Sequence, residues 1–235
     1  MLKMVSNRKS LILEGNEGFY TMILYIIRHG ETDYNTVRKL QGWLDQPLNQ
    51  NGRDLASLTG EALQDVRFDL CITSPLSRSY ETAQIILESS KNETVEIRVD
   101  ERIKEISFGE WEGLCCARQH YEIPDDDFER FFRDPIDMEP FPGGENVQML
   151  SKRTGDFYRE LIAREDLQDK TIMISTHGCA TRALLRNVYG ENEPFWHGHV
   201  PPNCAVNIVK VENGISTLLE DDKIYYDPSL CIRHY

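Results

Sequence analysis

The sequence has no long apolar run. The longest, residues 22–27, is far shorter than the roughly 20 residues that a membrane-spanning helix needs. Near the start, residues 11–13 are too few for the apolar core of a secretory signal peptide, and polar residues follow at once. We therefore expect a cytoplasmic protein that has no membrane partner.

Basic residues are also scarce. The chain has 26 lysines and arginines against 39 aspartates and glutamates, which gives a net charge of −13. Nucleic-acid binding depends on a basic face that neutralises phosphates, so we expect no nucleic-acid partner. A small phosphorylated molecule needs only a local basic pocket, and the net charge does not exclude one.

The six cysteines show no metal or redox pattern. None forms a C-x-x-C pair, and a chain of 235 residues is not a small disulfide scaffold, so we expect free thiols. The segment His197-x-His199 invites a metal-site interpretation. No carboxylate or thiol stands near it at ligand spacing, and structural zinc takes four ligands, so we expect a loop there and no metal site.

The residues that are present are typical of a globular α/β protein. Hydrophobic residues make up 40% and charged residues 28% of the chain. Apolar runs alternate with segments of helical periodicity, which predicts a three-layer fold with an open, mostly parallel sheet flanked by helices. The predicted strands are 22–27, 69–73, 95–99, 171–175 and a hairpin of 205–211 with 216–219; the predicted helices are 52–66, 77–87 with Ser77 as N-cap, 146–164 with Asn146 as N-cap, and 180–189.

The domain organisation follows from the same pattern. We expect residues 22–235 to form a single domain and residues 1–21 to be an N-terminal extension that the domain can do without; a short arm packed on the domain is the alternative. Residues 113–145 are predicted to form a cap-like excursion over the core. Within them, 122–145 hold nine acidic and two basic side chains, for which a solvated face is the default explanation.

Polar side chains follow three of the predicted strands. Arg28 and His29 come after the first, Ser74 to Arg78 after the second, and His177 after a later one. Ligands bind beyond the carboxyl ends of the strands in sheets of this kind, so these groups can converge in one cleft.

Together with one carboxyl, such a set suits phosphoryl transfer. Arg28 and Arg78 can neutralise phosphoryl oxygens, and a neutral imidazole can attack phosphorus to give a phosphohistidine that water discharges. A single carboxyl that serves first as acid and then as base completes the cycle. Glu105 is our candidate because it lies among apolar residues; Glu110 and Glu112 are the alternatives. Taken singly, each of these residues is more commonly structural.

Several motifs in a fixed order make a catalytic role for these residues the better interpretation. Together the motifs resemble the histidine phosphatase superfamily, which includes the phosphoglycerate mutases. Several spaced blocks in the right order make the resemblance specific, and it covers roughly residues 22–220. The blocks are Arg28-His29-Gly30-Glu31-Thr32 with Asn35, residues 42–48 with Gly52, residues 74–78 with 81–83, residues 102–113 around Glu105, and Thr176-His177-Gly178 with 182–184.

The resemblance implies a role for each catalytic residue. His29 would be the phosphorylated nucleophile, and Glu105 would be the proton donor, in agreement with the choice made from the residues. The phosphoryl group would be held by Arg28, Arg78 and His177.

The resemblance also implies the rest of the pocket and its ligands. Asn35 and Gly178 would line the substrate-binding site beside the phosphate-binding residues. The superfamily requires no metal and no organic cofactor, so the expected partner is a small phosphorylated metabolite. A homodimer is compatible with the sequence.

Three activities remain open within this resemblance. The cofactor-dependent mutases carry a longer insertion with paired arginines that grip a substrate carboxylate, and this chain lacks that pair. It resembles the smaller phosphatases instead, so we expect a phosphatase, with a phosphoglycerate mutase as the alternative. A catalytically idle protein that binds phosphorylated ligands is disfavoured because all five core positions are intact. If the acidic excursion overhangs the cleft, it would disfavour polyanions and tolerate leaving groups that carry an amine.

Overall fold

The central element of the fold is a six-stranded sheet. The computed structural model describes residues 20–189 and 193–230. The strand order is β3-β2-β4-β1-β5-β6; β1, β2, β3 and β4 run parallel, whereas β5 is antiparallel to both of its neighbours, which confirms the expected mostly parallel sheet. The strands are β1 (Thr21–Arg28), β2 (Leu70–Thr73), β3 (Ile97–Val99), β4 (Thr171–Thr176), β5 (Val206–Glu212) and β6 (Ile215–Lys223).

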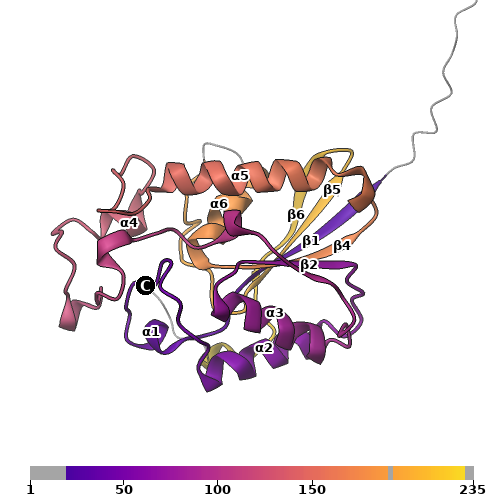
Figure 1. Cartoon of the computed structure of the whole chain (residues 1–235), viewed down its shortest axis with the longest axis horizontal. Helices are drawn as coiled ribbons and strands as arrows, with labels where there is room; N and C mark the ends of the chain where they lie inside the picture. Colours follow the sequence, from indigo (N-terminus) through magenta and orange to yellow (C-terminus); the bar gives the residue numbers. More distant parts are fainter. Residues whose placement is uncertain (1–19, 190–192, 231–235) are drawn as a thin grey trace, which may run out of the picture.

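Helices cover both faces of the sheet, as Figure 1 shows. α2 (Gln50–Ala62) and α3 (Ser77–Ser89) lie on one face, and α5 (Val147–Ala163) and α6 (Gly178–Tyr189) lie on the other. This confirms the three-layer architecture. The shorter helices are α1 (Asp33–Thr36), α4 (Arg130–Arg133) and the 3₁₀ segments Glu101–Ile103, Gly109–Trp111, Arg118–His120, Glu165–Leu167 and Pro228–Leu230.

The core lies between these layers. Phe157 and Leu161 of α5 pack with the strands on one face, and Leu55 of α2 packs with Ile86 and Leu87 of α3 on the other. Each is at most 3% exposed, and burying an apolar side chain of this size contributes about 1.5–3 kcal/mol. No helix in the described ranges is long and apolar enough to cross a bilayer.

The helix N-termini show where local sequence signals hold. Asn146 caps α5 as expected, with its side-chain oxygen 2.9 Å from the backbone nitrogen of Met149. The expected cap of α3 is wrong: Leu76 occupies the N-cap position, and Ser77 is the first helical residue. The Ser77 hydroxyl donates instead to the carboxylate of Asp45 at 2.8 Å, a distant partner that the local pattern does not reveal.

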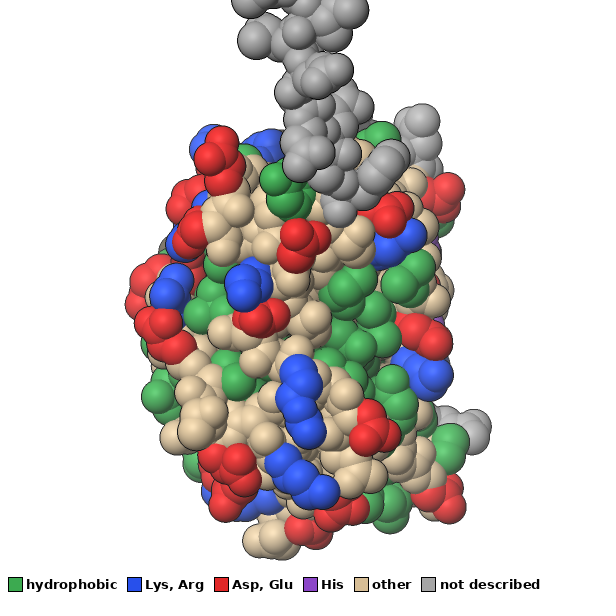
Figure 2. Space-filling model, turned by 90° about the vertical axis from the view of Figure 1, so that its right-hand side faces the viewer, with side chains coloured by type: hydrophobic (Ala, Val, Ile, Leu, Met, Phe, Trp, Pro, Cys, Tyr) green, Lys and Arg blue, Asp and Glu red, His purple; other side chains and the backbone are tan. Residues whose placement is uncertain are grey.

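The expected N-terminal extension, residues 1–21, lies outside the described residues except for its last two, where β1 begins. The excursion of residues 113–145 contains α4 and lies beyond the carboxyl ends of the parallel strands (Figure 1). Figure 2 shows the opposite end of the molecule, where acidic and basic side chains are interspersed.

Two glycines bring the loop after β1 into backbone contact with α2. A Cβ atom on Gly52 would lie 2.2 Å from the carbonyl oxygen of Glu31, and one on Gly30 would lie 2.5 Å from the carbonyl oxygen of Gly52. Any larger residue would therefore push apart two rigid backbone segments. The close approach fixes the loop that carries His29.

We predict that Gly52→Ala destabilises the protein, although glycine to alanine in a helix is normally stabilising. The added methyl group must displace backbone, which costs about 1–3 kcal/mol. The control is Gly155→Ala in α5, where the nearest atoms belong to the flexible Arg159 side chain. Thermal unfolding checks the pair; a Gly52→Ala protein that melts at or above the wild-type temperature would contradict the prediction.

Candidate active site

Parallel pairing of β1 with β4 places the two histidines side by side. In this pairing Arg28 stands opposite Thr176, the last residue of each strand, so His29 and His177 directly follow the two strand ends. The backbone N–H of His29 donates to the carbonyl of Thr176 at 2.9 Å. The two imidazole ring centres are 5.1 Å apart.

His29 is buried, and its orientation is set by hydrogen bonds. Its Nδ1 lies 2.6 Å from the carbonyl oxygen of Gly30, and since a carbonyl only accepts, Nδ1 carries the proton. The other ring nitrogen, Nε2, is then unprotonated in the neutral imidazole. The His29 carbonyl accepts from the side chain of Asn203 at 3.0 Å, which holds the backbone of this residue as well.

Two buried guanidinium groups lie at the same cavity. Arg78, at the start of α3, donates to the carbonyl oxygens of Gly42 at 2.8 Å and Leu44 at 3.0 Å. Burial lowers the pKa of Arg78 to about 10, so the group stays cationic at neutral pH. Arg28 donates through Nη1 to the carbonyl of Pro201.

His177 is fully buried and neutral. Burial, followed by repulsion from the charge of Arg78, holds the pKa of His177 well below its usual 6.5. Its Nε2 lies 2.7 Å from the hydroxyl of Ser74 at the end of β2. Its Nδ1 is buried and has no hydrogen-bond partner within the described part of the chain.

The carboxylate of Glu105 lies at the N-terminus of α6. It accepts hydrogen bonds from three backbone N–H groups, those of Ile106 at 2.9 Å and of Cys179 and Ala180 at 3.1 Å each. The apolar surroundings expected for Glu105 are therefore only part of its environment, because these donors stabilise a carboxylate. Of the three candidate carboxyls, Glu105 alone lines the cavity; Glu112 instead accepts from the backbone of Trp43 at 2.9 Å.

Sequence reasoning missed the residue that holds the Glu105 segment in place. Arg153 of α5 donates to the carbonyl oxygens of Arg102 at 2.7 Å, Lys104 at 2.8 Å and Glu105 at 2.7 Å. It also forms a bidentate ion pair with Glu145, both bonds being 2.8 Å. The backbone of the Glu105 segment is thus held in place by a guanidinium group that does not line the cavity.

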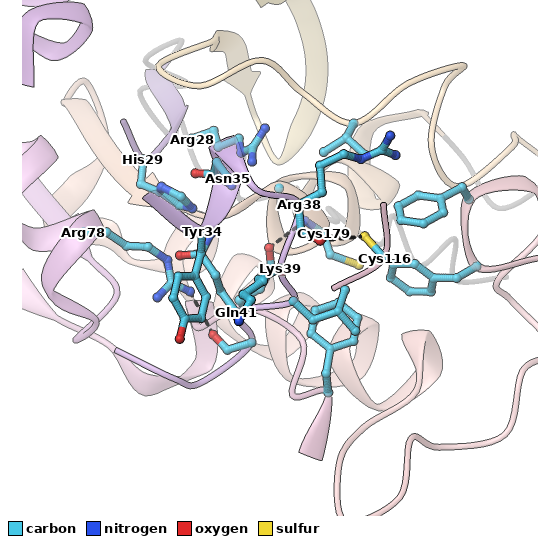
Figure 3. Close-up of a pocket in the computed structure, with 18 of the residues that line it drawn as sticks. Arg28, His29, Tyr34, Asn35, Arg38, Lys39, Gln41, Arg78, Cys116 and Cys179 are labelled. Carbon is cyan, nitrogen blue, oxygen red and sulfur yellow. Dashed lines mark hydrogen bonds between the residues drawn. The ribbon is translucent and has the colours of Figure 1, made fainter. Parts of the chain in front are cut away.

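The cavity brings together almost all of the predicted site residues. Its volume is about 100 Å³, and Figure 3 shows His29 and Arg78 on one side of it and Arg38 on the other. His177 is not part of the lining but lies beside His29. The lining includes the predicted residues Arg28, His29, Asn35, Arg78, Glu105 and Gly178.

The excursion contributes aromatic rather than acidic side chains to this cavity. Phe131 and Phe132 of α4 line it, and the acidic side chains of residues 122–145 do not. Arg38 and Lys39 place two further positive charges at its wall. The excursion does overhang the cleft, but the expected preference for leaving groups with an amine loses its basis.

The histidines of the His197-x-His199 segment have other partners. The His197 ring stacks on Tyr189 with ring centres 3.6 Å apart, and Nε2 of His199 lies 3.0 Å from the carboxylate of Asp222. No group of three or more potential metal ligands occurs among residues 20–189 and 193–230.

Comparison with known proteins matches this geometry to a family. Residues 24–220 match the sequence profile described as the histidine phosphatase superfamily (branch 1). The match includes most or all of each strand, the helices on both faces and every predicted site residue.

Relatives with more than one activity are similar to this chain. It is 29% identical over 198 residues to phosphoserine phosphatase 1 of Hydrogenobacter thermophilus, covering 84% of this chain and 90% of the relative. It is 31% identical over 163 residues to 2,3-bisphosphoglycerate-dependent phosphoglycerate mutase 2 of Gloeobacter violaceus, covering 69% and 74%. The solved structure of Bacillus stearothermophilus YhfR superimposes with a TM-score of 0.75 at 29% identity, covering 86% of this chain and 98% of that one.

We predict that the free energy of unfolding decreases as the pH falls below 6.5, in part because of His177. The unfolded chain takes up a proton on this residue near pH 6.5, whereas the buried imidazole does not, so protons favour the unfolded state. His177→Gln removes a contribution of up to about 1.4 kcal/mol per pH unit, and denaturant titrations at several pH values measure the slope. The control is His120→Gln at an exposed position. An unchanged slope in His177→Gln would contradict the assignment.

Arg153→Lys should lower turnover by about 100-fold while leaving the fold intact, because lysine cannot hold three carbonyls and Glu145 together and Glu105 is then misplaced. The decrease should appear in kcat of phosphate release rather than in KM. Arg159→Lys is the control, since Arg159 lies on the same helix with an exposed side chain paired to Asp156. Equal rates in the two variants would exclude a positioning role for Arg153.

Proposed function

Since the chain belongs to the histidine phosphatase superfamily, we propose that it is a metal-independent phosphomonoester hydrolase that acts on small phosphorylated metabolites through a phosphohistidine at His29. The hydrogen bond from His29 Nδ1 to the Gly30 carbonyl carries this proposal. It makes Nε2 the unprotonated ring nitrogen, and His29 lines a cavity that holds two buried guanidinium groups. This is the arrangement that a nitrogen nucleophile for phosphorus requires.

In the first half of the reaction, Nε2 of His29 attacks phosphorus and the bond between phosphorus and the leaving-group oxygen breaks. Arg28 and Arg78 neutralise the phosphoryl oxygens as negative charge develops on them. His177 supports them in the neutral form, accepting from Ser74 at Nε2 and donating from its buried Nδ1 to a phosphoryl oxygen.

Glu105 moves the proton in both halves. In the first half, the carboxyl group of Glu105 donates its proton to the departing oxygen. The carboxylate that remains is stabilised by three backbone N–H groups, and it then takes a proton from the water that attacks phosphohistidine. This step releases phosphate and restores both His29 and the protonated Glu105.

A cofactor-dependent phosphoglycerate mutase is the main alternative. Arg38 and Lys39 favour it, because they place cations where a substrate carboxylate could bind. Hydrolysis is better supported because the chain lacks the paired arginines with which a mutase retains its substrate while the phosphohistidine is kept from water. We also propose a cytoplasmic location, since the buried free thiols of Cys71, Cys115 and Cys179 suit a reducing compartment.

The test is hydrolysis of 4-nitrophenyl phosphate in the presence of a chelator. We expect the wild-type rate to be unaffected by the chelator and His29→Ala to lose at least about 1,000-fold in kcat, because the nucleophile is removed. Acid quenching of the wild-type reaction should trap a phosphoryl group on the peptide that contains His29. The control for correct folding is His120→Gln, which should retain the wild-type rate.

Two outcomes would reject the hydrolase. Activity that requires a divalent metal, or wild-type rates in His29→Ala, would contradict the mechanism. Interconversion of 3- and 2-phosphoglycerate that is faster than hydrolysis, with 2,3-bisphosphoglycerate added, would identify a mutase instead.

A further inference from the structure

A second cavity adjoins the active site beneath the excursion. Its volume is about 490 Å³, and we call it the distal cavity. Arg38, Cys116 and Phe132 line both this cavity and the active-site cavity, so the two cavities lie side by side. Figure 3 shows Arg38 and Cys116 on the side of the active site that lies away from His29. A leaving group that extends from His29 toward these residues points at the distal cavity.

The charge of the distal cavity is opposite to that of the excursion around it. Arg38, Arg118 and Arg133 line it, against a single carboxylate, that of Glu129. One of the only two basic residues in the acidic segment 122–145 therefore faces this cavity. Three guanidinium groups around one space form a binding site for an anion.

Arg118 and Arg133 form only weak, exposed ion pairs with neighbouring carboxylates. Arg118 lies 3.1 Å from Glu129 and Arg133 lies 3.2 Å from Asp127, and the arginine side chains are 85% and 70% exposed. Exposed pairs of this kind contribute little to stability. A ligand carboxylate or phosphate can therefore compete for both arginines.

Aromatic rings form the remaining walls. Tyr121, Phe128 and Phe132 line the cavity, and the rings of Phe128 and Phe132 meet edge to face with centres 5.6 Å apart. Phe131, which immediately precedes Phe132 in the chain, lines the active-site cavity. Flat apolar groups pack well against such rings, so the path between the two cavities suits a planar segment.

We propose that the distal cavity binds the far end of the leaving group and that the preferred substrates are phosphomonoesters in which a flat apolar segment links the ester to a second anionic group. This proposal rests on the proposed function, because the phosphoryl end must be held at His29. The second anion binds Arg118 and Arg133, with Arg38 at the junction of the two cavities.

Three substrates test the proposal: phenyl phosphate, biphenyl-4-yl phosphate and its 4′-carboxylate. Phenyl phosphate is the reference substrate, because it lacks both the second ring and the second anionic group. We expect the carboxylate to raise kcat/KM over plain biphenylyl phosphate by about tenfold, as a charge-assisted hydrogen bond to arginine would. Arg118→Gln and Arg133→Gln, both exposed positions at which substitution leaves the core intact, should each reduce this ratio severalfold. Arg130→Gln is the control, because Arg130 lies on α4 with Arg133 but does not line the distal cavity.

The outcomes separate this proposal from the proposed function. Failure of the wild-type protein to hydrolyse any of the three esters rejects the hydrolase, and calorimetric titration with the non-hydrolysable 4′-carboxybiphenyl phosphonate then tests the cavity alone. Tighter binding than the uncharged biphenyl phosphonate, weakened by Arg133→Gln, would support the anion site. Hydrolysis of all three esters with no preference for the carboxylate, or a preference that Arg118→Gln and Arg133→Gln leave unchanged, would overturn it.

Discussion

Parallel pairing of β1 with β4, in the register that sets Arg28 opposite Thr176, is the constraint on which the site depends. It aligns the ends of two neighbouring strands, so that residues 148 positions apart in the chain present adjacent imidazoles. On the other side of β1, the backbone of Arg28 exchanges hydrogen bonds with residues 204 and 205. Because its backbone is bonded on both sides, the loop that begins at His29 has little freedom, which is the preorganisation that a positioned nucleophile requires.

The site residues that can be predicted from the sequence are those that stand directly beside a recognisable strand or helix. His29 and His177 each follow a run of buried residues, and a strand end is where an α/β sheet binds its ligands. Arg153 gives no such signal, because it lies 48 residues from Glu105 and grips backbone carbonyls, which every residue has. The hydrogen bond between Ser74 and His177 cannot be predicted for a related reason. Serine is common near the start of any helix, so its presence there does not indicate a distant partner. Contacts between residues far apart in the chain, made to groups as common as a backbone carbonyl or a serine hydroxyl, leave no recognisable sequence pattern.

The excursion shows the difference between a charge count and a charge distribution. Its acidic residues predict a solvated surface, and most of them are indeed exposed. The count does not report which side chains α4 turns toward the cleft, and these are Phe131, Phe132 and Arg133. A ligand in the cleft therefore meets aromatic rings and cations, although the segment as a whole is strongly negative.

The position of the Glu105 side chain at the N-terminus of α6 affects how tightly the site can bind free phosphate. A helix N-terminus ordinarily binds phosphate well, because its backbone N–H groups have no partner within the helix. Here two of its N–H groups, those of Cys179 and Ala180, already donate to the side-chain oxygens of Glu105. Inorganic phosphate can therefore bind only the cationic groups that also bind the substrate, and it forms no additional hydrogen bonds with these two N–H groups of the helix. This arrangement limits how tightly free phosphate can bind beside His29.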